Sequence, residues 1–302
     1  MDHVVVVPTL NAAKDWAEFA AALLRCVSPS QVLIVDSEST DGTPELARQA
    51  GFSLAEIARK DFNHGRTRQM AAQSLPAAEI VIYMTQDAIL AEPGSLTKLL
   101  AGFEDSSVGV AFGRQLPRRQ AGPIETHSRL FNYPAKSAKR SLESRVEFGF
   151  KSIFVSNSFA AYRRHALDSV GGFPDNIILG EDTITAARLM LAGWKIAYVA
   201  EAQVCHSHEY SWRDEFRRYF DTGVLHARES WLIDEFGTTS GEGLRFLRSE
   251  MKYLGFKHVA LIPSALLRTA AKLIGYRLGR MESRLSVASK RKFSMHGNFW
   301  IE

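Results

Sequence analysis

The stretch Ile80-Val81-Ile82-Tyr83-Met84-Thr85-Gln86-Asp87-Ala88 decides the fold, because an apolar run ends there in one carboxylate. Short apolar runs bounded by polar residues are typical of strands buried on both faces of a parallel sheet. Val4–Val7 before Pro8 and Val32–Val35 before Asp36 repeat the pattern, with helix-like segments between the runs. This β-α-β-α order predicts an α/β architecture with an open, mostly parallel sheet and helices on both faces.

Polar side chains follow each of these three runs, namely Thr9 and Asn11, Asp36, and Asp87. In open α/β sheets, ligands bind beyond the carboxyl ends of the strands, so these side chains are expected to converge on one edge. The chain contains neither G-x-G-x-x-G nor G-x-x-x-x-G-K-[ST]. A nucleotide at this edge would therefore be held largely by side chains and not by a Gly-rich phosphate loop.

Composition indicates a globular protein, with 302 residues, 46% apolar, 23% charged and no fixed-period repeat. The net charge of +4 is too small to indicate nucleic acid. Cys26 and Cys205 form no disulfide-like spacing, which favours the reducing cytoplasm. The N-terminus shows no signal-peptide pattern, and no uninterrupted apolar run approaches the ~18 residues that span a bilayer. Any membrane contact is expected to be peripheral.

Beyond the three apolar runs, the sequence predicts a basic irregular segment, two further strands and a helix. Residues 114–151 are basic and irregular, which fits an excursion over the active edge or a solvated connector equally well. Ile153–Val155 is expected to be a strand, and residues 183–192 a helix whose first turn carries Glu181 and Asp182. A further strand over residues 195–199 precedes the Cys205-His206-Ser207-His208 segment.

Asp87 and either His206 or His208 could share a divalent ion, since Mg²⁺ and Mn²⁺ accept carboxylate oxygen and Mn²⁺ also accepts imidazole. The alternative is a structural or surface His pair, which is the more frequent origin of such a motif. Zinc held by Cys205 and His208 would need a second soft pair, which the sequence lacks.

Several short motifs stand in a fixed order along the first two-thirds of the chain. They are VPTLN (7–11), IVDSESTDGT (34–43), NHG (63–65) with Arg68, TQDA (85–88), GGF (171–173) and ED (181–182). In this order the chain resembles the family-2 inverting glycosyltransferases of the GT-A fold. The motifs FNHG (62–65), TQDA, LFNYP (130–134) and HSH (206–208) look most like bacterial rhamnosyltransferases of cell-surface polysaccharide assembly.

The resemblance implies transfer of a deoxyhexose, L-rhamnose from dTDP-rhamnose, to a saccharide or lipid-linked saccharide acceptor in surface polysaccharide synthesis, with Mg²⁺ or Mn²⁺. A UDP- or GDP-sugar donor is the alternative. A nucleotidyltransferase would need a Gly-rich phosphate loop after the first strand, and Pro8-Thr9-Leu10-Asn11 is not one. A non-catalytic nucleotide-sugar-binding protein is a third hypothesis, against which the intact Glu181-Asp182 pair argues.

The resemblance also assigns site residues. Asp182 corresponds to the catalytic base, Asp87 to the metal-binding member of the Asp-x-Asp motif, and His206 and His208 are its candidate co-ligands. The nucleotide-sugar set comprises Thr9, Asn11, Asp36, Arg68, Gln86, Asp87, Asn157, Phe173, Glu181 and Arg218. Thr85 replaces the first Asp of the motif, which gives a histidine ligand or a less metal-dependent enzyme more weight. A turn-forming role remains open for Asp36, and an ordinary charged helix face for Arg218.

The C-terminal part carries no further catalytic motif. We expect a GT-A domain over residues 1–220 and a helical appendage over residues 221–302. Residues 244–278 alternate apolar and basic side chains at helical spacing, and Pro263 should divide them into two helices. This surface either packs on the core or on another subunit, giving a homo-oligomer, or lies peripherally on the cytoplasmic face of the inner membrane.

Overall fold

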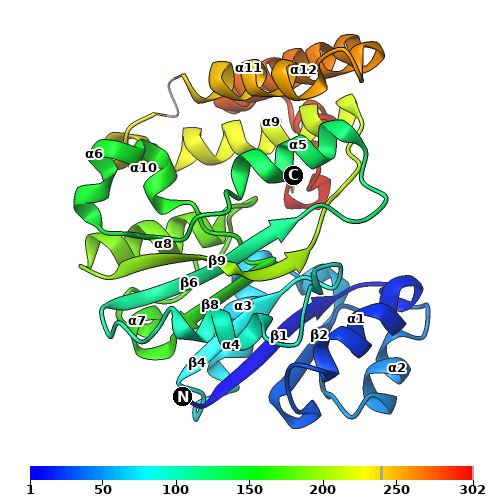
Figure 1. Ribbon diagram of the computed structural model, residues 1–302, viewed down its shortest axis with the longest axis vertical. Coiled ribbons are helices and arrows are strands. Elements are labelled where there is room, and N and C mark those ends of the chain that lie inside the picture. The colour runs from blue at the N-terminus through cyan, green and yellow to red at the C-terminus, as the bar shows by residue number, and fades with distance from the viewer. Residues whose placement is uncertain (239–240, 301–302) are drawn as a thin grey trace.

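The apolar runs of the sequence form the centre of one mixed sheet (Figure 1). The computed structural model describes residues 1–238 and 241–300. The strands are β1 (His3–Thr9), β2 (Val32–Asp36), β3 (Ser53–Glu56), β4 (Ile80–Met84), β5 (Ile89–Leu90), β6 (Val108–Leu116), β7 (Ala138–Arg140), β8 (Phe159–Arg163) and β9 (Lys195–Cys205).

Strand order across the sheet is β3-β2-β1-β4-β8-β6-β9-β5, and β7 pairs with β9. The pairs among β1, β2, β3 and β4 are parallel, as is the β6–β9 pair. β8 runs antiparallel between β4 and β6, and β5 and β7 are antiparallel to β9. The expected α/β fold with a mostly parallel sheet and a C-terminal helical appendage is therefore confirmed.

Helices cover both faces of this sheet, and further helices form a layer beyond it (Figure 1). They are α1 (Trp16–Leu24), α2 (Thr43–Gln49), α3 (His64–Gln73), α4 (Ser95–Ala101), α5 (Pro123–Asn132), α6 (Arg145–Phe148), α7 (Arg164–Ser169), α8 (Glu181–Leu191), α9 (Trp212–Arg228), α10 (Trp231–Phe236), α11 (Glu242–Leu254), α12 (Ile262–Arg280) and α13 (Val287–Phe293).

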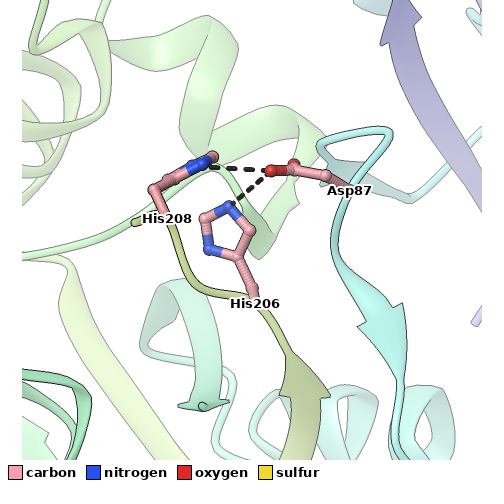
Figure 2. A group of neighbouring side chains, drawn as sticks. All are labelled: Asp87, His206 and His208. Atoms are coloured by element: carbon pink, nitrogen blue, oxygen red, sulfur yellow. Dashed lines mark ion pairs between the residues drawn. The ribbon is translucent and has the colours of Figure 1, made fainter. Parts of the chain in front are cut away.

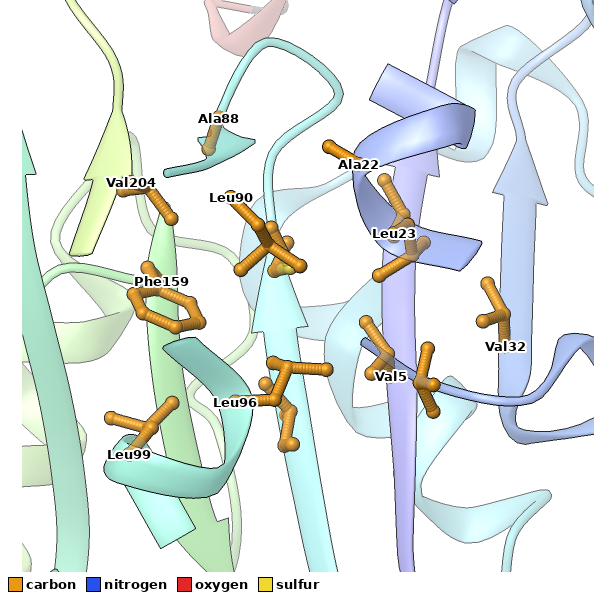
Figure 3. Packing of buried hydrophobic residues seen from close by; sticks show 14 of the residues in the cluster. Val5, Ala22, Leu23, Val32, Ala88, Leu90, Leu96, Leu99, Phe159 and Val204 are labelled. Carbon is orange, nitrogen blue, oxygen red and sulfur yellow. The ribbon is translucent and has the colours of Figure 1, made fainter. Parts of the chain in front are cut away.

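Alternating strand residues build two cores, one on each face of the sheet. Val5 and Val7 of β1 pack with α1 and α4 on one face, which Figure 3 shows around Leu23, Leu96 and Leu99. Val6, between them, faces the other core, to which α3, α7 and α8 contribute. Successive side chains of a strand point to opposite faces, so a strand covered on both sides reads as an unbroken apolar run.

Two local expectations differ from the structure. Ile153 ends a 3-10 helix, η5 (Gly149–Ile153), and the strand of this region is instead β8. Burial of Ile153 and Val155 in the second core explains their apolar character without a strand. Residues 114–151 are also more regular than expected, because they contain α5, β7 and α6. Pro123 lies in the first turn of α5, where its fixed φ favours helix initiation.

The C-terminal residues form two helices on α9, as Pro263 predicts, with Pro263 in the first turn of α12. α12 approaches α9 closely through glycines, since an added Cβ would lie 2.3 Å from Phe216 O at Gly275 and 2.0 Å from Phe220 O at Gly279. The expected domain boundary after residue 220 falls inside α9, and that division stays a prediction.

The last described residues return toward the sheet beneath α9 (Figure 1). Trp300 is buried in a small cluster with Phe220 and Val224 of α9 and with Ile178 of the loop before α8. The C-terminal segment thus packs against the loop that leads into the Glu181-Asp182 pair.

Candidate active site

The carboxyl ends of β1, β2 and β4 bring the predicted polar residues to one edge of the sheet. Gln86, just beyond β4, accepts a hydrogen bond from Leu10 N at 2.8 Å and donates one to Leu10 O at 3.1 Å. This pair of bonds joins the loop after β4 to the loop after β1. Gln86 therefore has a structural task at the site, and its nucleotide-sugar contact stays a prediction.

Asp87 meets both histidines of the His-x-His segment (Figure 2). Asp87 Oδ2 lies 3.2 Å from His206 Nε2 and 3.4 Å from His208 Nε2. One ligand atom of each residue lies within 4.8 Å of the others, and His206 Nε2 is buried with no hydrogen-bond partner among residues 1–238 and 241–300. A carboxylate and two imidazoles around one point suit a divalent transition ion such as Mn²⁺. The residues present therefore fit a metal.

Gln115 of β6 fixes which nitrogen of His206 carries the proton. Gln115 Oε1 lies 2.9 Å from His206 Nδ1 and accepts a hydrogen bond from Arg129 Nη1 at 2.6 Å. Arginine can only donate, so the Gln115 atom shared by both partners is an acceptor, and His206 Nδ1 must be the donor. The Nε2 lone pair of His206 is then free and points at Asp87, as a metal ligand requires.

The protonation states of this cluster also suit a cation. Burial alone would raise the pKa of Asp87, but His206 and His208 in their protonated forms, together with Thr85, outweigh it and hold that pKa well below its usual range. Burial lowers the pKa of His208 to about 4, with a smaller contribution from His206. At neutral pH the cluster is one carboxylate with two neutral imidazoles, the forms that bind metals.

The residues assigned to the nucleoside form a connected turn. Asp36 is 1% exposed and accepts bonds from Thr9 Oγ1 at 2.9 Å and from Ser39 Oγ at 2.6 Å. Asn11 accepts from Thr40 N and adopts a positive φ of 50°. These bonds give Asp36 the turn-organising role that the sequence left open, while its contact with a base stays a prediction.

Arg68 and Glu181 form a buried ion pair. Arg68 Nη1 lies 2.8 Å from Glu181 Oε1, and the two side chains are 5% and 7% exposed. Asn157 Nδ2 also donates to Glu181 Oε1, at 3.0 Å. Glu181 is therefore held by interactions within the protein, and the role of its neighbour Asp182 as the base stays a prediction. Direct contact of Arg68, Asn157 and Glu181 with a nucleotide sugar stays a prediction.

Asp182 lies in the first turn of α8, which begins after Gly180 in the left-handed region at φ 83°. Its Oδ2 accepts a bond from Asn157 N at 3.2 Å, and its Oδ1 from Thr183 N at 2.8 Å. Burial, and then the neighbouring charge of Glu181, raise the pKa of Asp182 to about 7. A carboxyl group with a pKa near neutrality is suited to accept a proton from a hydroxyl.

The remaining assigned residues differ in exposure. Phe173 is 4% exposed and packs edge-on against Tyr83 and Tyr162, so it supports the floor beneath the site. Arg218 is exposed on α9 and stacks over the ring of Tyr210, 5.9 Å from its centroid. Contact of either residue with the sugar or the diphosphate stays a prediction.

Sequence reasoning missed three residues that the structure places at the site. Gln115 is the first. Arg118 Nη2 donates to Asp87 O at 2.7 Å and its backbone N to Ser207 Oγ, so it joins the two ligand loops. His296 comes from the C-terminal segment and stands edge-on to His64, with ring centroids 5.3 Å apart. No local pattern marks these residues. The sequence indicates only that Arg118 lies in the basic stretch of residues 114–151.

Comparison with known proteins agrees with this geometry. Residues 80–220 match the family described as "Glycosyl transferase family group 2". The O-antigen chain rhamnosyltransferase RfbN of Salmonella typhimurium is 42% identical over 302 residues, covering 99% of this chain and 96% of the relative. The O-antigen chain rhamnosyltransferase WbaN of Salmonella anatum is 44% identical over 298 residues, covering 98% and 95%.

Among solved structures, the mannosyltransferase PcManGT from Pyrobaculum calidifontis, in complex with GDP-Man and Mn²⁺, has a similar fold. Its TM-score is 0.57 at 19% identity, with 99% of this chain and 84% of that chain covered. At this identity the likeness concerns the fold.

Proposed function

The chain belongs to glycosyl transferase family 2 and is an inverting glycosyltransferase, and from this premise we propose that it is a rhamnosyltransferase. The donor in this proposal is dTDP-L-rhamnose, and the acceptor is a lipid-linked saccharide of surface polysaccharide synthesis at the cytoplasmic face of the inner membrane. The two relatives above 40% identity, both named rhamnosyltransferases, support the sugar. Family membership also argues against the nucleotidyltransferase and non-catalytic alternatives.

The observation that carries the mechanism is the half-buried position of Asp182 beside Glu181 in the first turn of α8, where desolvation and the charge of Glu181 raise its pKa. Asp182 takes the proton from the acceptor hydroxyl while that oxygen attacks the anomeric carbon from the side opposite the diphosphate. The new glycosidic bond forms as the bond to the diphosphate oxygen breaks, so configuration inverts without a covalent enzyme intermediate. Asp182 then releases the proton to solvent, and the nucleoside diphosphate leaves.

The residues around Asp87 act on the leaving diphosphate. A divalent ion held by Asp87, His206 and His208 would supply positive charge that stabilises the charge developing there. Gln115 keeps His206 in the tautomer that leaves Nε2 free, and Arg118 joins the two loops that carry the ligands. Arg218 would approach the diphosphate or the acceptor from α9.

The donor and the base are tested separately. A thermal-shift panel should show that dTDP with Mn²⁺ raises the unfolding temperature more than UDP or GDP with the same ion. D182N should abolish transfer while leaving dTDP binding largely intact. A larger increase of the unfolding temperature with UDP or GDP would contradict the proposed dTDP-sugar donor. Normal transfer by D182N would contradict the assignment of Asp182 as the base.

The metal site is tested by binding alone. Q115L should weaken Mn²⁺ binding by roughly 10- to 100-fold, because it removes the partner that fixes His206. Free Mn²⁺ is measured by electron paramagnetic resonance during a titration. The exposed Q120L variant is the matched control and should bind as the unmodified protein does. Equal affinity for Mn²⁺ in both variants would contradict the role of Gln115.

A further inference from the structure

Helices α11 and α12 expose an unusually apolar surface that the active site does not use. In Figure 1 they form the outermost layer, beyond α9. The α11–α12 face is defined by large apolar residues that are 48% to 99% exposed, namely Leu244, Phe256, Val259, Leu266, Leu267, Leu273 and Ile274. Leu266 and Leu273, like Leu267 and Ile274, are seven residues apart and so lie on one side of α12. Apolar surface gathered in this way marks a protein or membrane contact.

Helix α12 buries small residues and exposes large apolar ones, which is the opposite of a helix that covers a hydrophobic core. The residues that it buries are small, namely Ala265, Ala271, Gly275 and Gly279. Its large residues point outward, and Leu267 and Ile274 are 50% and 54% exposed. The segment Val259–Arg280 has a mean hydropathy of 1.2 in its most apolar window, of which 17% is buried. The large apolar side chains of α12 are therefore not used to pack the described part of the chain.

The same helices concentrate positive charge. Residues 242–281 contain eight Lys and Arg against two Glu, whereas the whole chain has a net charge of only +4. Six of the eight basic residues are exposed, and the other two, Arg268 and Lys272, contact Tyr210 and Glu215. Both acids are engaged inward, because Glu250 is 2% exposed and Glu242 pairs with Lys151. Phe256 is 99% exposed at the turn between α11 and α12, next to Lys257 in sequence. An exposed aromatic residue with adjacent basic side chains is typical of helices that lie in a membrane interface.

We propose that the α11–α12 face binds the surface of an anionic lipid bilayer, with α12 lying along the interface. Lys and Arg are attracted to anionic headgroups while the apolar side chains enter the boundary with the acyl chains. The proposal deepens the proposed function, because a lipid-linked acceptor is anchored in such a surface. Vesicle binding needs no transfer, however, so the two proposals can fail separately.

Two other occupants fit the face less well. A second copy related by a two-fold axis would set the same basic surface against itself, and like charges across an interface oppose association. A membrane-spanning α12 would have to leave α9, losing the close glycine contacts and the ion pair of Lys272 with Glu215 at 3.2 Å. The charge and packing of the face favour a bilayer surface.

The test is co-sedimentation of the full chain with vesicles. Vesicles containing phosphatidylglycerol should bind the protein, vesicles of phosphatidylcholine alone should bind it far less, and 0.5 M NaCl should weaken the binding. The triple variant F256S/L267Q/I274Q should partition roughly tenfold less or lower, because three apolar side chains no longer enter the boundary. The double variant L24Q/L191Q, which changes exposed leucines elsewhere, is the matched control.

Each other outcome contradicts the proposal. Equal vesicle binding by the triple variant and the control, or no preference for anionic lipid, would overturn it. A lipid-free dimer in sedimentation equilibrium that the triple variant abolishes would assign the face to a second copy. Resistance of the bound protein to carbonate extraction would assign α12 to a membrane span. If the triple variant fails to fold, K252Q/K257Q tests the charge alone and should reduce binding to anionic vesicles.

Discussion

The kcat/KM of sugar transfer should fall as the pH is lowered through about 7, because Asp182 becomes protonated there. The carboxyl lies half-buried in the first turn of α8, where desolvation and then the charge of Glu181 raise its pKa to about 7 from an ordinary 3.8. A general base acts only when ionised, so the rate should follow the ionised fraction. That fraction is about 0.09 at pH 6 and about 0.9 at pH 8, a tenfold change in kcat/KM for a pKa of 7.

The assay is release of nucleoside diphosphate from dTDP-rhamnose at saturating Mn²⁺ and constant ionic strength, from pH 5.5 to 9. Mn²⁺ and dTDP affinities are measured at each pH, and His208, with a pKa of about 4, should leave them steady over this range. A rate that is flat down to pH 5.5 would refute the raised pKa. If any residual activity of D182N fell at the same pH as that of the unmodified protein, the decrease would belong to another titrating group.

The Asp182 carboxyl should stabilise the fold more at low pH than at high pH, which is opposite to the pH dependence of the transfer rate. Because its folded-state pKa lies above its unfolded value, it stabilises the fold fully below about pH 3.8 and loses that contribution as pH rises through 7. Asn cannot ionise, so the unfolding temperature of D182N relative to the unmodified protein should increase from pH 5 to pH 8. A difference that does not depend on pH would contradict the shift.

Two further predictions concern packing and the buried ion pair. G275A should lower the free energy of unfolding by about 1–3 kcal/mol, because the new Cβ would lie 2.3 Å from a carbonyl oxygen of α9. G243A, in open space on α11, should change it by less than about 1 kcal/mol and in the stabilising direction. R68M should cost about 3–5 kcal/mol, because it leaves Glu181 buried without its cation. R66M removes a pair that is more than half exposed and should cost under about 1 kcal/mol. Urea denaturation measures all four, and equal effects within either pair would contradict the reasoning.

The sequence predicts β1, β2 and β4 because each is an apolar run rich in β-branched residues. It does not predict β8, whose FAAYR sequence holds two alanines and no β-branched residue. The place of β8 between β4 and β6 depends on pairing with strands distant in sequence. Local propensity is weak there, and tertiary contacts decide.

Some residues of the candidate site could also be predicted from the sequence, whereas others could not. Asp87, His206 and His208 each directly follow a strand, so their meeting at one edge can be inferred from topology. Gln115 contacts His206 across 91 residues of sequence, and His296 reaches His64 from the other end of the chain. Neither contact leaves a spacing pattern, because it arises only when the sheet and the C-terminal segment are assembled.

The glycine contacts between α9 and α12 have a consequence for the choice of acceptor. Backbones that touch at Gly275 and Gly279 hold α12 on α9, and Phe220 and Val224 of α9 pack with Ile178 of the loop before Asp182. If α12 rests on lipid, these contacts would hold Asp182 at a set height above the bilayer. The enzyme would then select acceptors by length, because a growing glycan would react only when its terminal hydroxyl reaches that height. Acceptors one or two sugars shorter or longer should react more slowly on membranes than in detergent.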